Sequence, residues 1–265
     1  MIRDMNENVI ANELISRFLA NKDSLSYANT GSDNTYLGWV TDFRLSDSFD
    51  QKIRLDLRNV NDLFLLFVLA IVWSRTGPWE NAAYFVAHLK VQGKHRPDFW
   101  SEKRNCEDEM SLSKSSALNC RDFVKGFDPR KKISFRADLY DSIYVLATNW
   151  NLIIDTLEQS ERTKNFDLFI DQMRNIEGLG VGRNKMLIKI PLILRELRCQ
   201  AIYANIPGAY CCVPDARVYK AAKNLGINLP ALTTLNGLKA SSSKIYSLFG
   251  DLYDLPLFAY SDLVQ

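Results

Sequence analysis

Three glycines at alternate positions, Gly178, Gly180 and Gly182, lie in the stretch IEGLGVGRNKM. A turn this tight needs positive φ angles or a bare backbone, and glycine supplies both at low cost. A helix that begins after such a turn exposes backbone amides at its positive end, where a phosphate binds well, and Arg183 and Lys185 add positive charge there. The stretch therefore predicts a phosphate-binding hairpin. Its spacing also fits GxGxxG, but no strand is expected before it, which excludes a dinucleotide-binding fold.

A second stretch, VPDARVYKAAKNLG, places Asp215 directly before a predicted helix over 216–225 that Gly226 ends. Aspartate is a common N-cap, because its carboxylate accepts hydrogen bonds from backbone amides of the first helical turn. The residues alone thus predict a capping role for Asp215.

The cysteines and histidines exclude most metal chemistry. The odd number of cysteines, their irregular spacing and the absence of a CxxC pair argue against a disulfide framework and favour a reducing, intracellular setting. With only His88 and His95 as histidines, no structural metal and no iron–sulfur cluster is expected. The five cysteines are Cys106, Cys120, Cys199, Cys211 and Cys212.

Positive charge is concentrated in two segments. The chain has a net charge of +2, but residues 94–136 carry +4 and residues 180–224 carry +6, so the remainder is at −8. Two positive segments in an otherwise acidic chain predict a polyanion-binding face. The alternative is that they are solvated helix surfaces.

The elements that must position these residues are expected to be helices. The chain has 265 residues, 47% of them hydrophobic, and apolar spacings of three and four recur along it. The run 63–73 is too short to cross a bilayer and predicts a buried helix, and no secretory signal is expected. Segment 91–135 is polar, with a helix expected only over 116–124, and a short strand or turn is expected over 36–43. The other expected helices cover 6–19, 60–73, 78–90, 137–147, 152–157, 166–174, 186–197 with a bend at Pro191, 216–225, 243–249 and 252–262.

Three ordered motifs carry a resemblance to a known superfamily. GVGRNKM is similar to the hairpin LPGVGRKTA of helix-hairpin-helix (HhH-GPD) DNA glycosylases, and VPDARVYKAAKNLG is similar to their VDTHVxRVxxRLG. Upstream, LLFVLAIVWSRTGPWENAAYFVAHLK resembles their LLxxxLSQxTxWxNVxxAxxxLK. The resemblance spans residues 65–226 and implies an all-α, two-lobed fold forming a single unit. The expected parts of the chain are an N-terminal helix and loop (1–59), first core helices (60–92), a basic insertion (93–135), the hairpin and catalytic helices (136–226) and C-terminal helices packing on the body (227–265), of which the insertion and both termini lie outside the resemblance.

The resemblance places Asp215 on the family's catalytic aspartate. Its role would be to stabilise positive charge at the sugar C1′ and to orient or deprotonate the attacking water. Bifunctional members carry a Schiff-base lysine two residues after the last hairpin glycine, where this chain has Asn184. A monofunctional glycosylase that uses water is therefore expected. The alternative is a one-residue slip that makes Lys185 the nucleophile.

The remaining site residues also follow from the resemblance. Arg75 would enter the gap left by the flipped base, and Trp73 and Trp79 would line the base pocket, although packing in the core is the alternative for both tryptophans. The DNA-binding set comprises Gly178, Gly180, Gly182, Arg183, Asn184, Lys185, Lys189, Arg75 and Arg217.

The expected function is hydrolysis of the N-glycosidic bond of a damaged or modified base in double-stranded DNA, including hypermodified bases of phage type. The alternatives are a transferase that modifies bases of phage DNA on the same scaffold, and a non-catalytic DNA-binding hairpin protein. No cofactor is expected apart from a monovalent cation at the hairpin. The chain is expected to be a monomer without a membrane partner, cytoplasmic, or nuclear in a eukaryote.

Overall fold

The computed structural model describes residues 6–25, 32–38, 55–76, 79–116, 137–177, 179, 189–231 and 234–263. Every regular element within these ranges is a helix, so the all-α class is confirmed for them. The chain divides into two compact units, one formed by Met1–Trp39 with Ile190–Gln265 and the other by Val40–Lys189. The division after Lys189 falls inside the 136–226 segment that the resemblance treats as one block.

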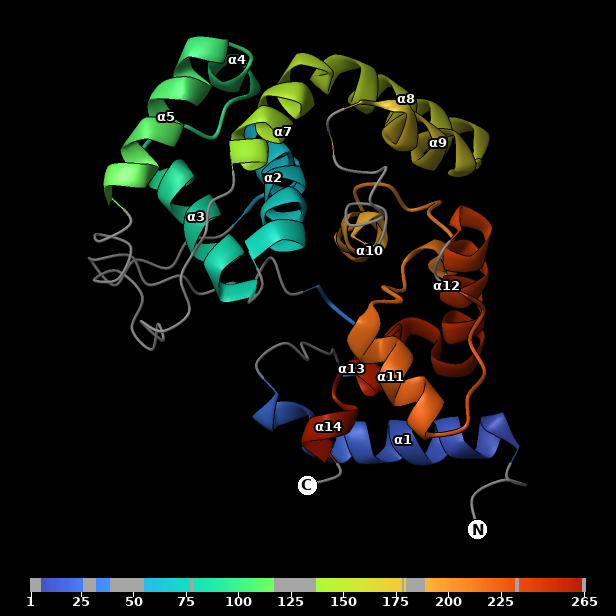
Figure 1. Cartoon of the computed structure of the whole chain (residues 1–265). Helices are drawn as coiled ribbons and strands as arrows, with labels where there is room; N and C mark the ends of the chain where they lie inside the picture. The colour runs from blue at the N-terminus through green and yellow to red at the C-terminus, as the bar shows by residue number, and fades with distance from the viewer. Residues whose placement is uncertain are drawn as a thin grey trace. The chain divides into compact units, whose positions relative to one another are not determined.

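The first unit joins the two ends of the chain. Its N-terminal helix α1 packs against α12, α13 and α14 (Figure 1) and buries Ile10, Leu14 and Phe18. Glu7, at the start of α1, accepts a hydrogen bond from the Asn228 amide at 3.0 Å and forms an ion pair with Lys244 at 2.9 Å. The elements of this unit are α1 (Glu7–Asn21), η1 (Lys22–Ser24), α10 (Ile190–Cys199), η3 (Gly208–Tyr210), α11 (Ala216–Asn224), α12 (Leu235–Phe249), η4 (Gly250–Leu252), α13 (Leu255–Phe258) and α14 (Tyr260–Leu263).

The second unit is built around α2, which is buried on all sides from Leu63 to Val72, as the apolar run predicts. Trp150 presents its ring edge-on to Phe64 and Phe67, with centroids 5.2 Å apart in each pair. Such edge-to-face packing adds to the burial of apolar area. The elements of this unit are α2 (Val60–Thr76), α3 (Trp79–Val91), α4 (Pro97–Trp100), α5 (Lys103–Ser116), α7 (Ala137–Thr148), α8 (Trp150–Thr163) and α9 (Asp167–Asn175).

Helices α4 and α5 were not predicted, since only 116–124 was expected to be helical in this polar segment, and 117–124 lies outside the described residues. Both helices pack against α7. Trp100 is fully buried and donates from Nε1 to the Lys94 carbonyl at 2.7 Å, and Cys106 is buried on α5. Lys94 also pairs with Glu109 at 2.5 Å. Part of the expected basic insertion is thus anchored in the core of the second unit.

Two predictions about helix ends have different outcomes. Gly226 ends α11 as expected: its φ is +79°, and the Ile227 amide donates to the Ala222 carbonyl at 2.9 Å, which closes the helix. The predicted bend at Pro191 stays a prediction, because α10 begins at Ile190 and residues 180–188 lie outside the described residues. A proline in the first turn costs no hydrogen bond, since its amide position has no helical partner there.

Candidate functional site

Asp215 is the N-cap of α11. Its backbone is extended, with φ −76° and ψ 178°, and its Oδ1 accepts hydrogen bonds from the amides of Arg217 and Val218, each at 3.0 Å. These bonds satisfy two donors that the helix itself leaves without partners. The half-buried carboxylate is therefore held in one orientation at the start of the helix.

The loop that delivers Asp215 is anchored from the C-terminal part of the first unit. The Val213 amide donates to Asp254 Oδ1 at 2.8 Å, and the Cys212 amide donates to Ser242 Oγ at 3.1 Å. Both bonds are buried. Cys212 and Val213 are buried as well, so the backbone that precedes Asp215 is held by side chains of α12 and of the residue before α13.

Asp254 accepts a second hydrogen bond from the buried guanidinium of Arg195 on α10, with Nη1 to Oδ1 at 2.9 Å. Burial raises the pKa of the Asp254 carboxyl, and the nearby charge of Asp215 raises it further, while Arg195 and the Val213 amide act in the opposite direction. One buried carboxylate thus links α10 to the loop that carries Asp215.

The guanidinium of Arg195 also lies against two tyrosine rings. Its Cζ is 4.9 Å from the centroid of Tyr36 and 5.8 Å from that of Tyr253, and these two rings meet edge-on. The Tyr36 hydroxyl donates to Glu196 Oε1 at 2.9 Å. Within the part of the chain that the structure describes, Arg195 Nε has no hydrogen-bond partner. The aromatic faces lower the cost of keeping the arginine charged in the core.

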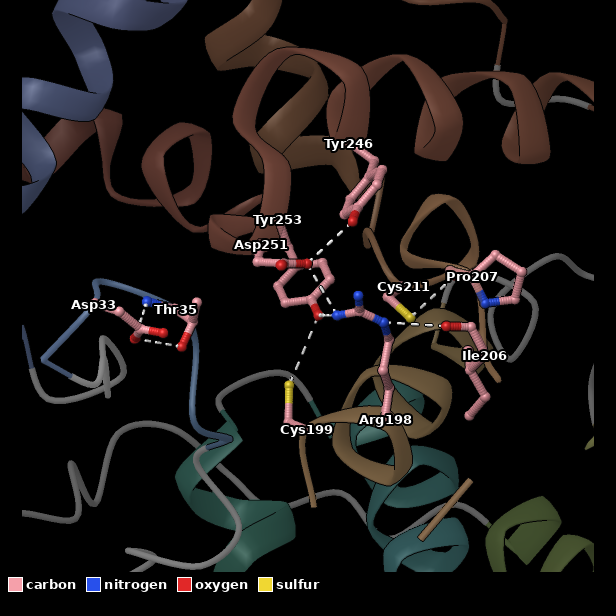
Figure 2. A network of polar contacts seen from close by, with 10 residues as sticks. All are labelled: Asp33, Thr35, Arg198, Cys199, Ile206, Pro207, Cys211, Tyr246, Asp251 and Tyr253. Carbon is pink, nitrogen blue, oxygen red and sulfur yellow. Dashed lines mark hydrogen bonds and ion pairs between the residues drawn. The ribbon is translucent and has the colours of Figure 1, made fainter. Parts of the chain in front are cut away.

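A second arginine, Arg198, lies about one turn along α10 and holds a neighbouring network, which Figure 2 shows. It donates to Asp251 Oδ1 at 2.9 Å, to the Ile206 carbonyl at 3.1 Å and to the Tyr253 hydroxyl. Tyr246 on α12 donates to the same Asp251 oxygen at 3.1 Å. Arg195 and Arg198 therefore bind consecutive residues, Asp254 through its carboxylate and Tyr253 through its hydroxyl.

Gly208 allows this network to form close to α12. A Cβ atom at Gly208 would lie 2.1 Å from the ring of Tyr246, so any other residue would displace that ring. The loop after α10, which the sequence indicates only as an irregular segment, is therefore packed directly on α12.

The predicted hairpin lies outside the described residues. Its predicted DNA-binding residues are therefore not described: Gly178, Gly180, Gly182, Arg183, Asn184 and Lys185. Arg75 is in the last turn of α2 and Trp79 begins α3, but the structure does not describe their side chains.

Three of the other predicted residues make specific contacts. In the second unit, Lys189 is buried, and its Nζ lies 3.9 Å from the ring centroid of the half-buried Trp73. A phosphate contact by Lys189 would require its side chain to turn away from this ring. In the first unit, Arg217 donates to Asp262 at 2.8 Å and to Ser261 at 3.0 Å, so α14 already holds this guanidinium.

The site also involves residues that the sequence motifs do not indicate, above all Arg195 and Asp254. The available signal is in the helix IPLILRELRC, where Arg195 and Glu196 interrupt an otherwise apolar stripe. Charged residues at positions that a helical pattern buries need partners, which marks them as part of a network. The pattern does not say which residues those partners are.

The four described cysteines are free thiols: Cys106, Cys199, Cys211 and Cys212. Burial raises the pKa of Cys199 to about 12 and that of Cys106 to about 11. No group of three or more histidine, cysteine, aspartate and glutamate side chains able to hold a metal ion occurs among the described residues.

Comparison with protein-family models, with curated proteins and with solved structures finds no match to this chain. Among the residues that the structure describes, no helix is long and apolar enough to span a membrane.

Proposed function

We propose that this chain is a monofunctional DNA N-glycosylase that flips a damaged or modified base out of duplex DNA and hydrolyses its N-glycosidic bond. The observation that carries the proposal is the position of Asp215. The stretch VPDARVYKAAKNLG is similar to the family's VDTHVxRVxxRLG, and Asp215 falls on the aspartate of that motif. Its carboxylate is fixed at the N-terminus of α11 by the Arg217 and Val218 amides. A rigid carboxylate at this place suits a reaction that develops positive charge on a sugar.

In the proposed reaction, the bond between C1′ and the base nitrogen breaks and its electron pair leaves with the base. The carboxylate of Asp215 stabilises the positive charge that develops at C1′. A water molecule then adds its oxygen to C1′ and gives up a proton, which Asp215 accepts and later returns to solvent, while the departing base takes up a proton from solvent. The products are the free base and an abasic site in an unbroken strand.

The buried support under Asp215 favours this proposal over a purely capping role. Catalytic groups work best when their surroundings hold them in place, because no reorganisation is then needed during the reaction. The Val213 amide, Asp254 and Arg195 form such a support, with bonds of 2.8 and 2.9 Å in the core. A cap on a surface helix needs no charged pair beneath it, since the cap bonds themselves satisfy the amides.

The absence of a lysine at position 184 supports a reaction with water in place of a Schiff base, with Lys185 as the alternative nucleophile. Treatment with borohydride in the presence of substrate DNA distinguishes the two. We expect no covalent protein–DNA complex, whereas a trapped complex that disappears in Lys185→Ala would assign the reaction to the lysine.

The test of the proposed function is a panel of duplexes, each with one damaged or hypermodified base, incubated with the full chain. Released bases are measured by mass spectrometry, and abasic sites by strand cleavage after alkali. We expect one or more duplexes to give free base and alkali-labile sites in equal amounts. An altered nucleoside with an intact glycosidic bond would instead indicate a base-modifying transferase, and binding without either product a DNA-binding protein.

A further inference from the structure

The exposed face of α11 carries positive charge and no acidic residue. Five exposed residues follow one another around this face, in the order Lys223, Ala216, Lys220, Asn224 and Arg217. The opposite face, with Val218, Ala221 and Ala222, is buried in the first unit. Since Asp215 is the N-cap of α11, the proposed catalytic carboxylate lies at the start of the helix that carries this positive face.

Lys220 and Lys223 differ from most basic residues of the first unit in having no acidic partner among the described residues. Five other basic residues of this unit each form an ion pair with an aspartate or glutamate: Arg17, Arg195, Arg198, Arg217 and Lys244. Arg217, the residue of this face nearest Asp215, is held by Asp262 and lies with its Cζ 4.2 Å from the ring of Phe258. The two lysines are thus the part of the face whose charge the described protein leaves uncompensated.

Lys223 lies in the last turn of α11, where a positive charge also favours the helix dipole. Lys220 is in the middle of the helix and has no such role. Stabilisation of the helix therefore explains Lys223. It explains neither Lys220 nor the absence of acidic residues from the whole face.

We propose that Lys220 and Lys223 bind the DNA backbone at phosphates flanking the nucleotide whose base is removed. Lys220 is five residues from Asp215, about 7.5 Å along the helix axis, and Lys223 is about 4.5 Å further. Flexible lysine side chains at this spacing match the backbone of one DNA strand, which carries a charge every 3.4 Å or so along its axis. This inference rests on the proposed function and adds a second phosphate-binding element to the predicted hairpin.

The test compares the wild-type chain with Lys220→Gln/Lys223→Gln in binding a duplex that contains a tetrahydrofuran abasic-site analogue, over a range of salt concentrations. If each lysine neutralises one phosphate, the slope of log K against log salt falls by about 1.8, and affinity at 0.1 M salt falls roughly 60-fold. Loss on the unmodified duplex of the same sequence should be similar, because phosphate contacts do not read the base.

Two control variants separate charge at this face from charge in general. Lys220→Arg/Lys223→Arg keeps the charges and should keep the wild-type slope. Arg162→Gln/Lys164→Asn removes two exposed positive charges from the end of α8 in the second unit and should change the slope by much less. Asparagine is chosen at position 164 because Lys164 has a φ of +55°, which asparagine tolerates. Equal thermal midpoints for all variants show that each is folded.

The results separate the inference from the function on which it rests. If the wild type excises a base and Lys220→Gln/Lys223→Gln binds with an unchanged slope, the proposed contact is wrong and the glycosylase proposal stands. If the wild type binds neither duplex, both proposals fail. If it binds an RNA hairpin more tightly than duplex DNA and the double variant loses that binding, the face serves a different nucleic acid.

Discussion

Arg195 and Asp254 form an ion pair over 2.9 Å in which each side chain is only 5% exposed. The same carboxylate oxygen accepts the Val213 amide, two residues before Asp215. This pair therefore joins the buried helix α10 to the segment that places the proposed catalytic aspartate.

Removing one member of this pair should be costly. Arg195→Met leaves the Asp254 carboxylate buried without its cation, and we expect the free energy of unfolding to fall by about 3–5 kcal/mol. Urea denaturation measures the loss. The matched control is Arg17→Gln, which removes an arginine from a pair whose side chains are 52% and 53% exposed and should change stability by about 0.5 kcal/mol or less.

The double variant Arg195→Met/Asp254→Asn should be less destabilised than the sum of the two single variants, because it removes both charges of the pair and leaves neither one without the other. Additive losses, or a loss below about 1 kcal/mol for Arg195→Met, would contradict the role given to this pair.

Glu7 should make stability depend on acid pH. The Asn228 amide first, and then Lys244, lower the pKa of its carboxyl below the ordinary value of 4.5. A lowered pKa in the folded state means that the stabilisation is fully present above about pH 4.5 and is lost as the pH falls through the folded-state value. Glu7→Gln should therefore reduce the urea midpoint at pH 7 and have much less effect at pH 3.

The control for Glu7 is Glu13→Gln, whose partner Arg17 lies four residues along the same exposed helix face. Its effect should be small at both pH values. A Glu7→Gln effect as large at pH 3 as at pH 7 would show that the carboxylate charge is not what holds α1 to residue Asn228 and α12.

Gly208 should not tolerate alanine while Tyr246 is present. The added Cβ would lie 2.1 Å from the Tyr246 ring, so either the ring or η3 must move. We expect Gly208→Ala to lower stability by about 1–3 kcal/mol. In a Tyr246→Leu background the same change should cost clearly less, and equal costs in the two backgrounds would mean that the ring is not the obstacle. Thermal or urea unfolding of the four chains gives this coupling.

The thiols of Cys106, which is buried, and Cys199, which is half-buried, should react slowly. Because burial raises the pKa of Cys199 to about 12 and that of Cys106 to about 11, almost no thiolate forms at pH 7.5. Iodoacetamide labelling followed by mass spectrometry should modify both residues slowly in the folded chain and rapidly in urea. Rapid labelling of Cys199 under native conditions would show that the network around Arg198 opens readily.

The sequence predicts most described helices but misplaces some ends for a common reason. The apolar pattern that predicts α8 stops at 157, whereas the helix continues to Thr163. Ser160 lies on the buried face of this longer helix and satisfies its hydroxyl by donating to the Thr156 carbonyl at 2.8 Å. In α12, predicted only over 243–249, the buried Ser241 and Ser242 find partners in the Pro230 carbonyl and the Cys212 amide. Apolar periodicity does not count a buried serine whose partner is supplied by the fold.

In the candidate site too, the sequence predicts what depends on local signals and misses what depends on distant partners. The cap at Asp215 depends on a helix start, which is a local signal, and the structure has it where the sequence predicts it. The support by Arg195 and Asp254 joins residues 59 positions apart, and no local spacing contains that information. The three glycines of the hairpin and Asn184 lie outside the described residues, and their roles stay predictions.

The most direct test of the account is the rate of base release by Asp215→Asn under single-turnover conditions, on a duplex that the wild type has been shown to process. Asparagine caps a helix about as well as aspartate, so stability and DNA affinity should be close to those of the wild type. The account predicts a rate at least about 100-fold lower, because the charge that stabilises C1′ is gone. Wild-type rates of base release in Asp215→Asn would contradict the account.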